Sequence, residues 1–236
     1  MKYHRAQYHY RCLKLAYERL RDSNLRLGPQ KRQIKPGEGA AFEPRIQPNE
    51  RWGLIIGDCV QNLRAALDHA AFQLVPEPPK SEQAVRIAFP IFDDEPKYQE
   101  WKAKHTKWIT AVDPRAVAII DALQPCRGAD PHGHILWKLY SLSNLDKHRS
   151  IHLAFVGIRE IASKEGFVVQ KLEPETGTVV IGSPPPDSGS DIHLQITVEV
   201  AFASGDDIAQ QPVFPMLVQI GATVAGTLNR LRRYMV

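Results

Sequence analysis

The side chains best suited to chemistry lie in the segment LIIGDCVQNLRAALDHAAFQLV (54–75). Asp58, Asn62 and His69 fall on one line of an α-helix, because they follow one another after four and seven residues. Exposed helix faces usually carry Lys and Glu, whereas alanines flank this line. We therefore predict that the three residues are buried or line a cleft. The alternative is a buried hydrogen-bond network that only holds helices together.

A second polar group stands where a predicted helix over residues 135–145 meets a predicted strand. It comprises Asn144, Asp146, Lys147, His148 and Arg149. Basic side chains in the last turn of a helix can simply complement the helix dipole and bind its last carbonyl groups. Mixed polar groups at such a junction also suit a functional loop held by rigid elements. We predict that this junction faces the polar line of the earlier helix.

Several stretches of residues 50–155 resemble a widespread family of uncharacterised bacterial and phage proteins. The stretches are GDCVQNLRAALDHAAFQL, FPIF, LQPC and LWKLYSLSNLDKHR. Within the first stretch, Arg64 and His69 are similar to the Arg-x(4–6)-His motif of HEPN-domain ribonucleases. This resemblance implies a helical, metal-independent endoribonuclease of a toxin or phage-defence system, acting without a cofactor. On an ideal helix Arg64 and His69 lie about 140° apart, so they share a site only across a homodimer or through long side-chain reach.

The resemblance also implies roles for single residues. His69 is the expected general base or acid, and Arg64 is the expected clamp for the phosphate charge. His148 is a further catalytic candidate. The expected substrate-binding residues are Asn62, Asn144, Lys147 and Arg149, with Asp58 and Asp146 in support.

Two other functions stay open. A metal-dependent hydrolase would use as ligands Asp58, His69, Asp146 and His148, in a chain without H-E-x-x-H spacing. A non-enzymatic binding or regulatory module would keep the polar face of residues 58–69 as a structural network. The chain has no P-loop, G-x-G-x-x-G or G-x-S-x-G motif, which argues against nucleotide kinases, Rossmann enzymes and serine hydrolases. The triplet HGH at 132–134 lies in a predicted loop and is expected to form a turn.

Positive charge is concentrated at the beginning of the sequence. The net charge is +4, but residues 1–35 hold ten Lys and Arg against Glu18 and Asp22, a net of +8. Four tyrosines interleave with these charges: Tyr3, Tyr8, Tyr10 and Tyr17. Such a helix suits a phosphate backbone, with RNA as the expected partner, or an acidic protein. A merely solvated helix face is the other interpretation.

The order of predicted elements favours an α+β fold in a single domain of residues 1–236. A helical bundle is expected over about 1–145, an antiparallel sheet over about 151–203, and a closing helix over 213–235. The helical part then spans 1–149 and the β-rich part 150–205. Three widely spaced cysteines and the lack of a long apolar run favour a cytoplasmic protein without membrane contact.

Overall fold

A computed structural model gives the structure of the protein. It describes residues 2–22, 40–42, 50–76, 87–149, 151, 153–163, 169–173, 178–181, 194–203, 205 and 207–235. Side chains are described for residues 2–18, 51–76, 87–149, 151, 153, 200–203, 205 and 207–235.

Helices make up most of this described part. The α-helices are α1 (Lys2–Asp22), α2 (Glu50–Gln73), α3 (Glu95–Lys104), α4 (Thr106–Ala111), α5 (Pro114–Ala122), α6 (Ile135–His148) and α7 (Val213–Leu231). Two short 3-10 turns are η2 (Pro125–Arg127) and η3 (Arg232–Tyr234). The strands are β1 (Ala40–Phe42), β2 (Leu153–Ser163), β3 (Val169–Glu173), β4 (Thr178–Ile181) and β5 (Leu194–Phe202).

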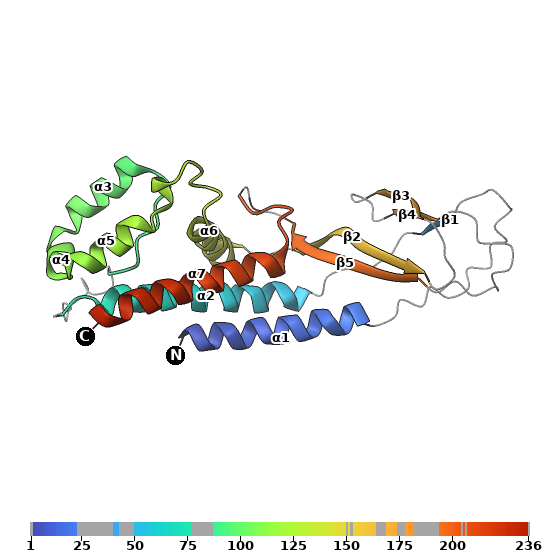
Figure 1. Ribbon diagram of the computed structural model, residues 1–236, viewed down its shortest axis with the longest axis horizontal. Coiled ribbons are helices and arrows are strands. Elements are labelled where there is room, and N and C mark those ends of the chain that lie inside the picture. The colour runs from blue at the N-terminus through green and yellow to red at the C-terminus, as the bar shows by residue number, and fades with distance from the viewer. Residues whose placement is uncertain are drawn as a thin grey trace.

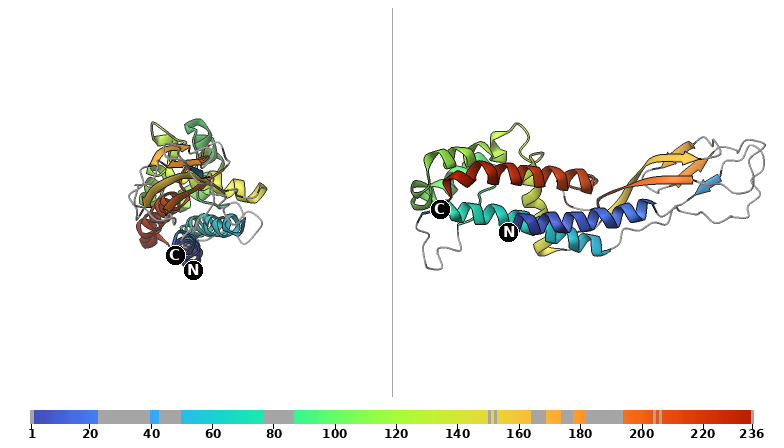
Figure 2. Two further views of the ribbon diagram at one scale, coloured as in Figure 1. Left: turned by 90° about the vertical axis from the view of Figure 1, so that its right-hand side faces the viewer. Right: turned by 60° about the horizontal axis from the view of Figure 1, so that its bottom comes forward.

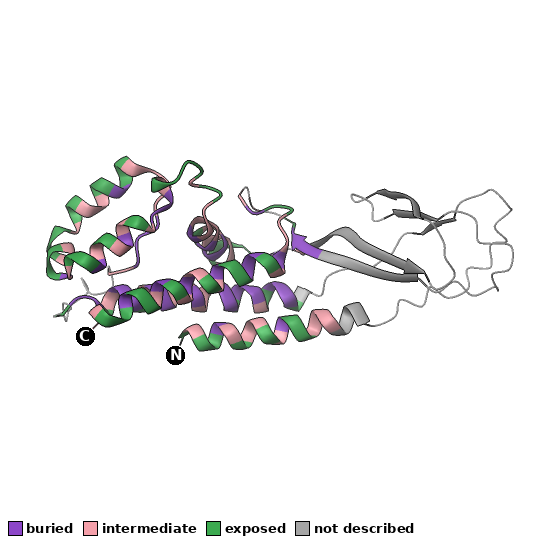
Figure 3. Cartoon of the chain, in the orientation of Figure 1, coloured by how far each residue is buried: buried purple, intermediate pink, exposed green. Residues whose placement is uncertain are grey.

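Helix α2 is the centre of the helical body. It contacts α1, α6 and α7, and Figures 1 and 2 show α1, α2 and α7 side by side along the long axis. Figure 3 shows buried residues along most of α2. One apolar stripe, spaced at helical intervals, is buried in full: Ile56, Val60, Leu63, Leu67, Ala71 and Leu74. Each of its Ile, Val and Leu side chains contributes about 1.5–3 kcal/mol when it leaves water, so α2 is held mainly by this stripe.

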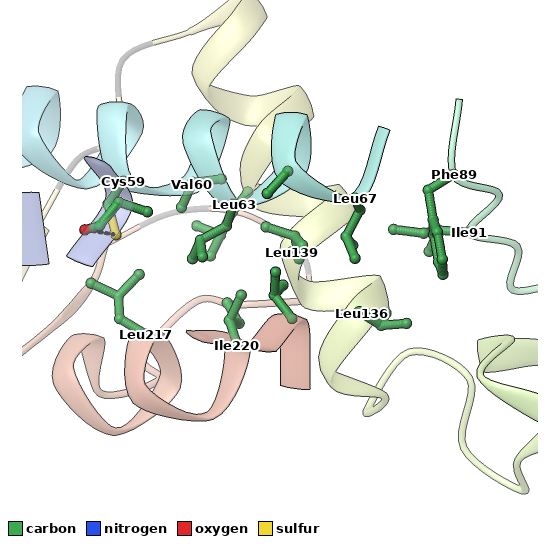
Figure 4. Close-up of a cluster of buried hydrophobic side chains, with 14 of the residues drawn as sticks. Cys59, Val60, Leu63, Leu67, Phe89, Ile91, Leu136, Leu139, Leu217 and Ile220 are labelled. Atoms are coloured by element: carbon green, nitrogen blue, oxygen red, sulfur yellow. Dashed lines mark hydrogen bonds between the residues drawn. The ribbon is translucent and has the colours of Figure 1, made fainter. Parts of the chain in front are cut away.

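The neighbours that cover the stripe come from distant parts of the chain. Figure 4 shows Val60 and Leu63 of α2 close to Leu139 of α6 and to Leu217 and Ile220 of α7, all of them buried. This packing explains why the long apolar helix α7 lies against α2.

Local sequence signals mark several helix ends. Asp113 caps α5 with a side-chain oxygen that accepts from the Arg115 amide, and Pro114 occupies the first helical turn. Helix α2 begins at Glu50 and ends at Gln73, three residues before Pro76. Helix α6 runs to His148, three residues beyond the predicted end at 145.

The predicted α+β class, with one antiparallel sheet over about 151–203, is wrong. The strands form two separate ladders, an antiparallel pair β2–β5 and a three-stranded ladder in the order β1-β4-β3. Among the strand side chains that are described, only Val200, Ala201 and Phe202 enter the core, at the end of β5 nearest the helices. Figure 1 shows the β2–β5 ribbon running away from the helical body. The fold is therefore a helical body with small strand ladders, because helices supply nearly all of the core.

The strand order β1-β4-β3 shows why the sequence did not predict how the strands pair. β1 lies in a Pro- and Gly-rich stretch of the sequence, yet Ala40 pairs with Ile181 of β4. Alternation of apolar and polar residues predicts a strand but does not predict its neighbour.

None of the described helices combines the length and the apolar character needed to cross a bilayer.

Candidate functional site

The polar line expected to form a site on α2 faces solvent. The Asp58 side chain is 66% exposed, and His69 is exposed as well. Asn62 turns back onto its own helix, where its Nδ2 donates to the Asp58 carbonyl oxygen at 2.7 Å. The expectation of a covered line is therefore wrong for Asp58 and His69.

A line one residue earlier on α2 is the one that meets the rest of the protein. We call Gly57, Gln61, Arg64 and Asp68 the inward line, and Asp58, Asn62, Ala65 and His69 the outward line. Both lines have the same spacing, and a shift of one residue rotates the face by about 100°. The spacing was thus recognised correctly, but on the adjacent face.

Gln61 connects the inward line to α6. Its Nε2 donates to the Ser143 carbonyl oxygen at 2.9 Å and to Asp146 Oδ2 at 3.0 Å. Its Oε1 accepts from Ser143 Oγ at 3.2 Å. Ser143 is buried, so this amide satisfies polar groups that water does not reach.

Two glycines allow α2 to lie this close to the end of α6. A Cβ at Gly57 would stand 2.0 Å from Asp146 Oδ1, and one at Gly53 would stand 2.3 Å from the Ile151 carbonyl oxygen. A side chain at Gly53 would meet fixed backbone, and one at Gly57 would force the Asp146 carboxylate to move. Two glycines four residues apart inside a helix were the available sequence signal for the covered face.

Arg64 was expected to clamp a phosphate, but it binds the protein's own backbone. Its Nη2 donates to the Phe89 carbonyl oxygen at 2.7 Å and lies 2.9 Å from Asp68 Oδ1. Asp68 Oδ1 in turn accepts from the Phe89 amide at 3.0 Å. The Arg64 side chain is only 14% exposed. The pair therefore holds both backbone groups of Phe89 and docks the FPIF segment on α2.

The polar junction at the end of α6 meets α2 through one carboxylate. Asp146 accepts from Gln61, and Asn144 is half-buried. Lys147, His148 and Arg149 are all exposed. The expected contact between junction and α2 thus exists, but Gln61 and Asp146 make it, on the inward line.

These positions limit the chemistry of the expected ribonuclease pair within one chain. The Arg64 guanidinium is bound to Asp68 and Phe89, whereas His69 lies on the outward line.

Among the described residues, no group of three or more His, Cys, Asp or Glu could hold a metal ion. The ligand set of the metal-hydrolase alternative is therefore not gathered: Asp58, His69, Asp146 and His148.

Cys59 lies at the edge of the buried apolar stripe of α2 and is unsuited to nucleophilic work. Burial raises the pKa of its thiol to about 12, with a smaller contribution from the Asp58 carboxylate. The thiol is therefore protonated at neutral pH. Its Sγ donates to the Ala6 carbonyl oxygen at 3.4 Å, which ties α2 to α1 (Figure 4).

Helix α1 is fixed to the body along one side only. Ala6 and Leu13 are buried, and the Tyr17 ring lies 4.5 Å from the Phe214 ring of α7 and 6.4 Å from the Trp52 ring of α2. Of the four tyrosines in the basic segment, Tyr3, Tyr10 and Tyr17 pack against the core. Tyr8 instead is 64% exposed.

The solvent side of α1 carries a regular row of cationic side chains around Tyr8. We call Lys2, Arg5, Tyr8, Arg11 and Lys14 the basic row; all five are exposed and follow one another at three-residue steps. Residues three apart are neighbours on a helix surface, and each step turns by about 60°. The row is therefore continuous and winds around the exposed side of α1 as it rises about 18 Å. Glu18 Oε1 lies 3.8 Å from Lys14 Nζ and partly offsets the positive charge of that lysine.

Comparison of the chain with models of protein families, with curated proteins and with solved structures found no match.

Proposed function

We propose that the protein binds single-stranded RNA along the basic row of α1. The observation that carries the proposal is the unbroken series Lys2, Arg5, Tyr8, Arg11 and Lys14 on the exposed side of a helix whose other side is buried. Cationic side chains neutralise phosphates and release counterions, and an exposed aromatic ring can stack on a base.

The attachment of α1 favours such binding. Because Ala6, Leu13 and Tyr17 pack against α2 and α7, the backbone that carries the basic row is already ordered. Less conformational entropy is then lost when RNA binds than with a disordered basic tail. RNA and a second copy of the chain are the proposed partners. The proposal places the protein in the cytoplasm, where free thiols such as Cys12, Cys59 and Cys126 persist.

Ribonuclease activity of this protein has weaker support than binding. Cleavage without metal needs an imidazole and a fixed cation at the same phosphate. His69 and His148 are exposed and could supply the imidazole. Arg64 would first have to leave Asp68 and Phe89, so another cation or a second chain would have to complete the site.

The test measures binding of labelled single-stranded RNA over a series of salt concentrations. Wild type is compared with Arg5→Gln/Arg11→Gln and with the matched control Lys97→Gln/Lys107→Gln, which removes two exposed lysines from α3 and α4. Each phosphate contact on a single strand contributes about 0.7 to the slope of log K against log salt. The α1 variant should therefore lower that slope by about 1.4, and the control should leave it unchanged.

Equal losses in the two variants would contradict the proposal, because they would show a nonspecific effect of net charge. The same mixtures, held in a metal chelator, are also analysed for RNA fragments with cyclic phosphate ends. Cleavage that His69→Ala reduces about 100-fold would support the ribonuclease hypothesis.

A further inference from the structure

The HGH loop places one imidazole between two carboxylates from distant parts of the chain. His132 Nδ1 lies 2.7 Å from Asp207 Oδ1, in the connection between β5 and α7. His132 Nε2 lies 3.2 Å from Asp93 Oδ2, just before α3. The ring therefore joins three connecting segments at one point.

Each of these contacts is a hydrogen bond only when the ring nitrogen that makes it carries a proton. Ionised carboxylates only accept hydrogen bonds, and a neutral imidazole has a single N–H. Only the imidazolium can donate to Asp93 and Asp207 together. Deprotonation must turn one nitrogen lone pair toward a carboxylate.

The two carboxylates differ in the other hydrogen bonds that they accept. Asp207 Oδ2 also accepts from Trp137 Nε1 at 2.8 Å and from Ser141 Oγ at 3.3 Å, both on α6. Asp93 makes no other hydrogen bond or ion pair among the described side chains. The contact with Asp207 is also the shorter one, so a neutral ring keeps its proton on Nδ1 and turns Nε2 toward Asp93.

We propose that His132 is a pH-sensitive latch that ties the segment before α3 to the segment before α7 when protonated and releases Asp93 when neutral. The released contact frees the Asp93 carboxylate, whereas Trp137 and Ser141 keep Asp207 on α6. The opening is thus confined to the side of α3.

The charges around the ring act in one direction. The hydrogen bond to Asp207 has the largest effect and raises the pKa of His132; desolvation lowers it, and the charge of Asp207 and the contact with Asp93 raise it further, so that the net shift is upward. Two other charged groups on neighbouring segments have partners of their own. Asp130, in the same loop as His132, accepts from the Gly133 amide, and Lys138 of α6 donates to Gln211. Because the folded pKa lies above the unfolded value of about 6.5, the stabilisation is complete below about pH 6.5. It is lost as pH rises through the raised pKa.

The pKa of His134, the second histidine of the loop, is shifted in the opposite direction. Its effect on stability can therefore be distinguished from that of His132. His134 caps α6, with Nδ1 accepting from the Leu136 amide at 3.2 Å, and burial lowers its pKa. Its contribution is therefore lost below about pH 6.5, whereas that of His132 is lost above it.

The experiment follows the free energy of unfolding and the NMR titration of the His132 ring from pH 5 to 9. Wild type is compared with His132→Gln, which cannot titrate, and with Asp93→Asn and Asp207→Asn. In wild type, His132 should titrate above the unperturbed histidine value of about 6.5. Amides at the start of α3 should lose protection as it does, after correction for intrinsic exchange. Asp207→Asn should lower the His132 pKa more than Asp93→Asn.

In His132→Gln the decline of stability above about pH 6.5 should disappear, while any decline below that value should remain. A wild-type His132 that titrates at or below about pH 6.5 would overturn the proposal. So would identical pH dependence of stability in wild type and His132→Gln.

Discussion

The inward and outward lines of α2 have the same residue spacing, one position apart, and opposite surroundings. Gln61, Arg64 and Asp68 bond to α6 and to Phe89, whereas Asp58 and His69 face water. Helical spacing therefore shows which side chains share a face, and it does not show which face is covered. That depends on elements far away in the chain.

The largest expected effect is a difference in the free energy of unfolding between a variant on the inward line and a variant on the outward line. Arg64→Ala leaves Asp68 and the Phe89 carbonyl without their partner in a mostly buried place, so the free energy of unfolding should fall by about 3 kcal/mol. The matched outward variant His69→Ala should stay within about 0.5 kcal/mol of wild type. Urea denaturation measures both. Comparable losses in the two variants would show that the outward line is also covered.

A glycine series tests how closely α2 approaches its neighbours. Gly53→Ala should lower the free energy of unfolding by about 2 kcal/mol, since its Cβ would strike the Ile151 backbone. Gly57→Ala should cost less, because the Asp146 carboxylate can rotate away. Gly221→Ala has nothing within 4 Å of the new Cβ and should stabilise α7 by about 0.5–1 kcal/mol. Thermal and urea unfolding give the order, and a tolerated Gly53→Ala would refute the close approach.

The smallest expected effect concerns neighbouring amides on the two lines. Gln61→Ala removes the hydrogen bonds to Ser143 and Asp146 and should cost about 1.5 kcal/mol. Asn62→Ala removes only a bond within its own helix and should change the free energy of unfolding by less than about 0.5 kcal/mol. If Asn62→Ala proved the more harmful, the assignment of the inward face would have to be reversed.

Local signals account for much of the helical body. The buried stripe of α2 and the Asp113 cap of α5 follow from helical periodicity and from the residue types at the helix ends. The single sheet was wrong because pairing is a long-range property. The short β1 strand lies among prolines and glycines, where no periodic pattern could mark it.

The site was predicted less well than the fold, for a related reason. Arg64 and Asp68 have the composition of a catalytic or phosphate-binding pair, yet they bind the Phe89 backbone. His132 was read as part of a turn, because Asp93 and Asp207 stand 39 and 75 residues away from it in the chain. Both groups depend on contacts that no local pattern encodes.

The contact between α2 and α7 has a consequence for biosynthesis. The apolar stripe of α2 is covered by Leu217 and Ile220, which the ribosome adds only after residues 75–216. Until then a long apolar surface on the nascent chain lacks its final partner, and contacts of such sequence separation form slowly. The nascent protein therefore presents a binding surface for chaperones, and its helical body can close only after α7 has left the exit tunnel.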